Sequence, residues 1–213
     1  MNPASNLDQL IRISSDPIAS RLPQQISQTG GKFIPGDLGL LLNTKNGFLA
    51  FESALHVFAS VDTDTAQGIP YWNGSRGWSI YDDLDLSGYT FFAQDIFGFP
   101  YAISDKGIVC KFDPESGLMK AHSGSLEEWA GVILEKYNYE TGWQVVHEWQ
   151  IKNHPIDFTY RLLPQKPFII GGEFKAENMK AIPSSQVAIT YFHLYKQVKD
   201  IPDGTSIEIN DWI

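Results

Sequence analysis

Residues 34–58 read IPGDLGLLLNTKNGFLAFESALHVF and decide the fold. Pro35 suits the first position of a helix, because that position needs no backbone N–H and proline already holds the helical φ. Three leucines follow on one helical face: Leu38, Leu41 and Leu42. Gly47 suits the end of the helix, since glycine adopts the left-handed backbone often found there. We therefore expect a helix whose leucines share one core.

Strand-like segments follow this helix directly and then recur as a meander. The predicted strands span residues 48–51, 55–58, 89–93, 99–104, 107–112 and 118–122. Turns that contain glycine separate the later strands, at 105–107 and 113–117, and favour hairpins there. The pattern is typical of a β-meander that grows one strand at a time.

Helices are predicted on both sides of the meander. Leu7, Leu10 and Ile11 have helical spacing near the N-terminus. After the meander, Ser125 and Glu128 form the pattern of a capping box. The apolar positions behind it repeat with the helical period: Leu126, Trp129, Ala130, Ile133, Leu134 and Tyr137. We expect Trp129, Ile133 and Leu134 to be buried on one face, and a second helix over 141–151.

The C-terminal part returns to β-like patterns after Pro155. The strands predicted there are 168–170, 187–195 and 206–209, with a turn at Pro202-Asp203-Gly204. Because helices and strands come in blocks and do not alternate, the fold class predicted is α+β. A length of 213 residues suits one domain. We place it over 1–213, with a core at about 30–153 and a β-rich C-terminal extension at about 154–213.

Composition narrows the partners. With 43% hydrophobic and 13% aromatic residues the chain is able to bury a core. The net charge of −9 argues against nucleic acid and disfavours an anionic membrane surface. It is compatible with a basic protein partner, or with solubility alone. The N-terminal residues lack a signal-peptide pattern and no apolar run reaches membrane-spanning length, so we expect a cytoplasmic protein. Cys110, the single cysteine, is expected to be buried and inert.

Two acidic motifs have chemical interpretations. VFASVDTDT, at 57–65, resembles the opening of haloacid-dehalogenase-type phosphatases, where Asp62 would be the nucleophile and Asp64 the acid/base. The alternative is a solvated turn after a strand. Asp83, Asp85 and the two residues Ser87-Gly88 fit the start of a calcium loop, but Gln94 replaces the required final glutamate. The ordinary acidic turn is favoured in both cases, and we expect no metal or cofactor.

The segment 60–88 is the candidate contact region. An insertion of this length without regular structure is usually functional or disordered, and its aromatic residues argue against disorder. We expect an ordered excursion whose aromatic side chains partly fill the core while its aspartates stay exposed. Trp72 and Trp78 are either core residues or contact residues. The candidate partner-binding residues are Asp62, Asp64, Trp72, Trp78, Asp82, Asp83 and Asp85.

The order of several motifs resembles the SUKH superfamily, whose signature is a proline-led helix that runs into Asn-Gly and then a strand. The positions that carry this pattern are Pro35, Asp37, Leu41, Leu42, Asn46 and Gly47. Further matching stretches are FFAQDIFG at 91–98, the turn at 113–117, SLEEWA at 125–130, PFIIGGEF at 167–174 and IPDG at 201–204. The resemblance therefore covers most of the chain beyond Phe33.

This resemblance implies one α+β domain with a curved, mostly antiparallel sheet, packed helices and no cofactor. It also implies a role similar to that of immunity proteins in bacterial polymorphic toxin systems, which bind a toxin domain, often a nuclease. No catalytic residue is implied, so we expect a protein that is not an enzyme. A related domain occurs in a fungal regulator of cell-wall synthesis, which leaves a regulatory protein-interaction module as the alternative.

Overall fold

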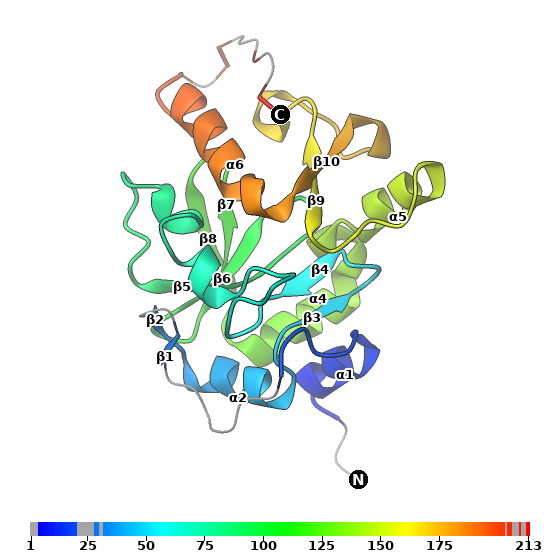
Figure 1. Ribbon diagram of the computed structural model, residues 1–213. Coiled ribbons are helices and arrows are strands. Elements are labelled where there is room, and N and C mark those ends of the chain that lie inside the picture. The colour runs from blue at the N-terminus through cyan, green and yellow to red at the C-terminus, as the bar shows by residue number, and fades with distance from the viewer. Residues whose placement is uncertain (1–3, 21–27, 30–31, 203, 206–208, 210–211) are drawn as a thin grey trace.

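The computed structural model describes residues 4–20, 28–29, 32–202, 204–205, 209 and 212–213. Within these residues the fold is α+β, with six α-helices, a curved six-stranded antiparallel sheet and two small two-stranded sheets in a single compact domain (Figure 1). The predicted fold class is confirmed. No helix among the described residues is long and apolar enough to cross a membrane.

The large sheet is the expected meander. Its strands are β3 Phe48–Ala50, β4 Leu55–Val57, β5 Tyr89–Gln94, β6 Pro100–Ser104, β7 Val109–Asp113 and β8 Leu118–Ser123. They lie in sequence order, and each pairs antiparallel with the next. A register shift between Phe91 and Ala93 marks a bulge in β5. One of the two small sheets pairs β1 Gln28–Thr29 with β2 Lys32–Phe33.

Helix α2, Gly36–Thr44, is the proline-led helix of the opening motif. Pro35 is its N-cap, one position before the first helical residue. All three leucines of the predicted face are buried in the main core: Leu38, Leu41 and Leu42. Gly47 has a φ of 73°, and a Cβ there would lie 2.7 Å from the backbone nitrogen of Ala59. Glycine is thus required both by conformation and by the close approach of the chain just after β4.

Helices α1 Asn6–Ile13, α4 Leu126–Thr141 and α5 Trp143–Lys152 confirm the other predicted helices. The Ser125 hydroxyl accepts a hydrogen bond from the amide of Glu128 at 3.1 Å, as expected of the N-cap. Trp129 and Ile133 are fully buried, and Leu134 is partly buried against the same core. The carboxylate of Glu127 accepts hydrogen bonds from the first amides of α1, which fixes that helix against α4.

Successive residues of β5 point to opposite faces of the sheet, and both faces are covered. Phe92 contacts Trp129 of α4 edge-on on one face. Phe91 contacts Trp78 on the other face. That second face is covered by residues 60–88, which contain α3 Ile69–Trp72 and a 3-10 turn at Trp78–Ile80, and by α6 Ser184–Val198 (Figure 1). The sheet therefore lies between two layers.

The C-terminal part differs from the prediction. Residues 187–195, expected as a strand, belong to α6, whose buried side chains recur every three or four residues. Residues 168–170 form a 3-10 turn, Phe168–Ile170. The strands of this part are β9 Tyr160–Pro164 and β10 Met179–Pro183, which pair with each other, with a 3-10 turn at Ala176–Asn178 before β10. Residues 206–208 and Asp203 lie outside the described residues. The extension is a hairpin plus a long helix, and "β-rich" was wrong.

Candidate protein-contact surface

The two tryptophans proposed as contact residues are core residues. Trp72 and Trp78 have no exposed surface. Trp72 stacks on Phe58 with ring centroids 5.1 Å apart, and Trp78 contacts Phe112 edge-on at 5.8 Å. The prediction that the aromatics of 60–88 partly fill the core while its aspartates stay exposed agrees with their burial. The assignment of these tryptophans to a partner surface is wrong, because the sheet has a second apolar face that they cover.

Two aspartates of the segment hold local turns. Asp62 Oδ1 accepts hydrogen bonds from the amides of Gly68 and Tyr71, at 2.8 and 3.3 Å, and so fixes the start of α3. This geometry favours the turn over the phosphatase interpretation, since the carboxylate already bonds to the backbone. Asp85 accepts from the amide and hydroxyl of Ser87 at 3.2 and 2.7 Å. Among the described residues no group of three or more His, Cys, Asp or Glu is arranged to hold a metal ion.

Two further aspartates pair with α6. Lys196 Nζ lies 2.9 Å from Asp82 and 3.4 Å from Asp83, and Asp83 also pairs with Lys199. The hydrogen bond from Lys199 lowers the pKa of Asp83 to about 2. These ion pairs attach the segment to the helix that lies beside it. Among the seven candidates, the Asp64 side chain is exposed, and no hydrogen bond or ion pair joins it to the described residues.

A different surface has the features of a contact site, and it begins at the turn between β3 and β4. Phe51, Glu52 and Ser53 have φ values of 54°, 55° and 68°. Left-handed conformations cost a non-glycine residue about 1–2 kcal/mol each. The short connection between the antiparallel strands β3 and β4 holds three successive residues in this conformation. Backbone strain of this kind is concentrated at functional sites.

Four rings form a stack beside this turn. Phe51 stacks on Tyr137 with centroids 5.0 Å apart, Tyr137 meets Trp143 edge-on at 5.4 Å, and Trp143 stacks on His147 at 4.8 Å. All four side chains are half-buried. We call this set (Phe51, Tyr137, Trp143 and His147) the ring stack. It joins the strained turn to α4 and α5.

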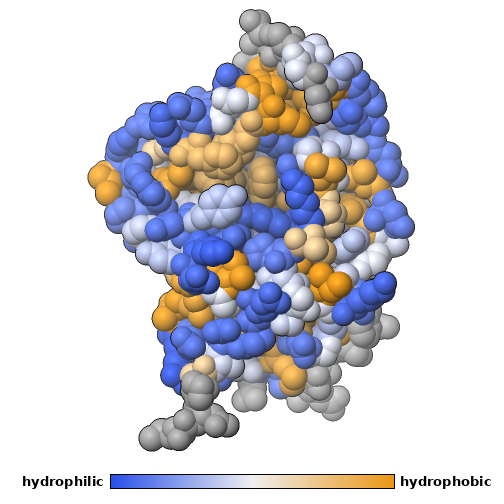
Figure 2. All heavy atoms as spheres, turned by 180° about the vertical axis from the view of Figure 1, so that it is seen from behind, coloured by the Kyte–Doolittle hydropathy of each residue, from blue (hydrophilic) through white to orange (hydrophobic). Residues whose placement is uncertain are grey.

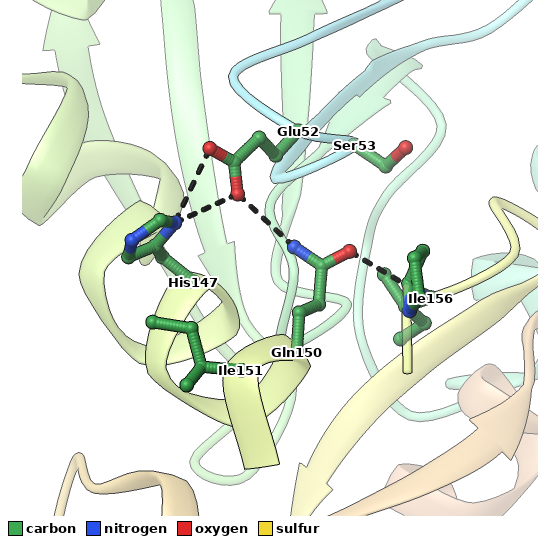
Figure 3. A pocket seen from close by; sticks show the side chains of 7 residues that line it. Glu52, Ser53, His147, Gln150, Ile151 and Ile156 are labelled. Atoms are coloured by element: carbon green, nitrogen blue, oxygen red, sulfur yellow. Dashed lines mark hydrogen bonds and ion pairs between the residues drawn. The ribbon is translucent and has the colours of Figure 1, made fainter. Parts of the chain in front are cut away.

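An open hollow of about 480 Å³ lies at the end of the ring stack (Figure 3). Its lining residues are Glu52, Ser53, His147, Gln150, Ile151, Pro155 and Ile156. Glu52 pairs with His147 Nδ1 at 3.0 Å and accepts from Gln150 Nε2 at 3.2 Å. The Gln150 carbonyl oxygen in turn accepts from the amide of Ile156 at 2.9 Å. These bonds link the turn at Glu52 to α5 and to the segment that follows it.

The hollow has an apolar rim. The Ile151 side chain is 72% exposed, although Val145, Val146 and Trp149 of the same helix are buried. Figure 2 shows that hydrophilic residues divide the apolar ones into separate patches on the face seen there. Pre-organised aromatic residues next to an exposed aliphatic side chain are typical of the centre of a protein interface.

The amino-acid sequence alone does not indicate this surface. Tyr137 fits the helical period of α4 and is therefore interpreted as a packing residue. Nothing in FESA, at 51–54, distinguishes a left-handed turn from a strand end.

A second polar cluster lies between α4 and the sheet, and its groups are bonded to one another. Lys111 Nζ lies 3.0 Å from Asp95 and donates to the Tyr101 hydroxyl at 3.2 Å. Tyr101 donates to the backbone carbonyl of Glu140, whose carboxylate meets His122 at 3.1 Å. Burial raises the pKa of Asp95. Since each polar group has a partner and the cluster fixes the end of α4 to the sheet, we interpret it as structural.

No protein-family model matches the chain, and no curated protein matches it. The likeness of its motifs to the SUKH superfamily therefore stays a prediction.

Proposed function

We propose that this chain is a non-enzymatic protein-binding protein that neutralises a bacterial toxin domain, with a nuclease as the favoured class. Two kinds of support carry the proposal. One is the order of SUKH-like motifs together with the α+β fold and antiparallel sheet that the resemblance implies. The observation that carries the binding role is the rigid ring stack and hollow beside the exposed Ile151 side chain.

Binding would neutralise the partner by covering its active site. A nuclease cleft is basic because it holds phosphates. A net charge of −9 on this chain favours approach to such a cleft and raises the association rate. A regulatory interaction module would use the same kind of surface. The neighbouring gene separates the two roles, since a toxin gene supports immunity and its absence supports regulation.

The test is co-purification with the protein encoded by the adjacent gene, together with protection of cells that express it. An Ile151→Asp variant should weaken the complex at least tenfold, because it places a charge at the apolar centre of the contact. Leu118→Asp is the matched control. Leu118 is 52% exposed but lies on β8, at the opposite edge of the sheet from β3, and its variant should bind normally.

Absence of both a complex and protection would contradict the proposal. Equal binding by the two variants would keep a protein-binding role but move the contact away from the hollow. The phosphatase alternative predicts magnesium-dependent phosphate release that is lost in Asp62→Ala, and this assay is run on the same preparation.

A further inference from the structure

A buried arginine lies at the junction of the sheet and the C-terminal hairpin. Arg161, on β9, has no exposed surface. Its Nη1 donates to the carbonyls of Tyr160 and Phe158, at 2.8 and 3.4 Å. Its Nε and Nη2 have no hydrogen-bond partner among the described residues. These two atoms form one edge of the guanidinium, the edge that binds anions with two parallel N–H groups.

Two uncharged polar side chains, His56 and Gln94, lie in the same region. The His56 ring meets the Phe158 ring edge-on at 6.2 Å, and the Phe158 carbonyl accepts a hydrogen bond from Arg161. His56 on β4 stands opposite Gln94 on β5, so the two side chains lie on the same face of the sheet. His56 is 3% exposed and Gln94 is fully buried. Both imidazole nitrogens and both amide atoms lack a hydrogen-bond partner within the described chain. Burial, and then the charge of Arg161, lower the pKa of His56, so the ring is neutral at neutral pH.

Burial lowers the pKa of Arg161 and the charge of Asp95 raises it, but no hydrogen bond or ion pair joins the Asp95 and Arg161 side chains within the described residues. Asp95 Oδ2 pairs with Lys111 at 3.0 Å, and Oδ1 accepts from the amides of Phe97 and Phe99. Burial lowers the pKa of Arg161 to about 10, which still leaves it charged at neutral pH. A buried charge without a bonded counter-ion costs several kcal/mol. The site therefore has one positive charge to be balanced.

The N-terminus of α6 adds to the positive electrostatic potential around Arg161. Ser184, the first residue of this 15-residue helix, is buried, and its hydroxyl has no partner in the part of the chain described. No side chain caps the helix. The amide of Ser184 bonds to Thr159, two residues before Arg161. The positive end of the helix dipole thus lies next to the arginine strand.

We propose that Arg161, His56 and Gln94 form an interior site for one small monovalent anion of the halide or formate class. The free guanidinium edge supplies two N–H donors, and the Gln94 amide and the neutral His56 ring supply one each. A single negative charge balances the single unpaired positive charge, whereas a divalent anion would leave a buried excess. This inference is independent of the proposed partner.

The first experiment is a crystal soak in sodium bromide, with anomalous scattering as the readout. The expected result is a bromide peak within hydrogen-bond distance of Arg161 Nε and Nη2. A site that holds only water in bromide, chloride and formate soaks overturns the proposal. A soak that shows bromide but not formate restricts the ligand to halides, and the reverse restricts it to carboxylates.

The second experiment measures unfolding in bromide, chloride and formate at constant ionic strength, with gluconate as the balancing anion. At concentrations above the dissociation constant, each tenfold rise in the free concentration of the anion that binds should raise the folding equilibrium constant about tenfold. Arg161→Met should abolish this dependence, and Gln94→Leu, which keeps the charge, should weaken it. Arg76→Met is the control, because Arg76 is exposed, and it should retain the full dependence. Anion-independent unfolding of the wild-type chain contradicts the inference even if Arg161→Met fails to fold.

Discussion

At the residue scale, Glu115 shows how one buried carboxyl joins two parts of the chain. It lies in the β7–β8 turn and is 2% exposed. Its two oxygens accept hydrogen bonds from the amides of Phe168 and Ile169, at 3.0 and 2.6 Å. Burial nevertheless raises its pKa from 4.5 to about 7. The side chain thus connects the large sheet to the C-terminal extension and titrates near neutral pH.

This pKa predicts a pH-dependent stability. The folded state binds the proton of Glu115 more tightly than the unfolded state does, so its stabilising contribution is complete below about pH 4.5 and is lost as the pH rises through about 7. The difference between the two pKa values corresponds to about 3 kcal/mol. Denaturant unfolding between pH 4.5 and 8 should show this decrease in the free energy of unfolding, added to the effects of the other groups that titrate in this range. Glu115→Gln, which cannot ionise, should flatten the profile, and an unchanged slope would contradict the assignment.

The turn at Phe51–Ser53 allows a test of backbone strain. Ser53 has a φ of 68°, which glycine adopts freely and β-branched residues avoid. We expect Ser53→Gly to leave the free energy of unfolding unchanged or to raise it by up to about 1 kcal/mol. Ser53→Val should lower it by about 1–2 kcal/mol. Chemical denaturation of the pair measures both values. Equal losses in the two variants would show that the side chain of Ser53, and not its backbone, matters.

At the element scale, residues 60–88 act as the cover of the second sheet face. Trp78 contacts Phe91, Phe112 and Tyr81 there. Its truncation in Trp78→Ala should cost about 3–5 kcal/mol, because it leaves a cavity beneath a segment with little regular structure. Tyr160→Ala, at a side chain 40% exposed, is the comparison and should cost less than about 1 kcal/mol. A small loss for Trp78 in thermal or denaturant unfolding would mean that the segment is not part of the cooperative core.

The elements differ in how far the sequence predicts them. The helix at α4 has a cap and a long regular period, and the meander strands are bounded by glycine turns, so local rules specify both. In α6 the run VAITYFHLY is rich in β-branched and aromatic residues, and its helix is specified by contacts such as the Tyr191 hydrogen bond to the carbonyl of Phe97. Such tertiary contacts override propensity and are invisible in the local pattern. The same holds for the ring stack, which joins Phe51 to three rings of α4 and α5 more than eighty positions later in the chain.

At the scale of the whole molecule, the acidic charge is distributed unevenly between structural and free groups. Asp82 and Asp83 attach α6 through Lys196 and Lys199, whereas Asp64 is exposed and unpaired among the described residues. The sequence alone predicts one contact patch that includes all of these aspartates. Composition gives the net charge but does not show which carboxylates form ion pairs within the fold. For Asp82 and Asp83 this pairing depends on a helix more than a hundred positions later in the chain.

This division separates two effects of charge reversal. Asp64→Lys removes a free negative charge, so it should slow association with a basic partner, and added salt should slow the wild-type association too. It should change the free energy of unfolding by no more than about 0.5 kcal/mol. Asp83→Lys places like charges beside Lys196 and Lys199, so it should increase amide hydrogen exchange in the last turn of α6. Stopped-flow association and hydrogen exchange measure the two.

The assignment of Asp64 to partner attraction and of Asp83 to fold stability requires that the two variants affect different measurements. If Asp64→Lys slows association and leaves hydrogen exchange in α6 unchanged, the charge of Asp64 steers the partner. If Asp83→Lys increases hydrogen exchange in α6 and leaves the association rate unchanged, the charge of Asp83 stabilises the fold. If association is insensitive both to Asp64→Lys and to salt, long-range attraction has no part in recognition. The net charge of −9 then serves solubility, and affinity must come from the apolar and aromatic contacts of the hollow.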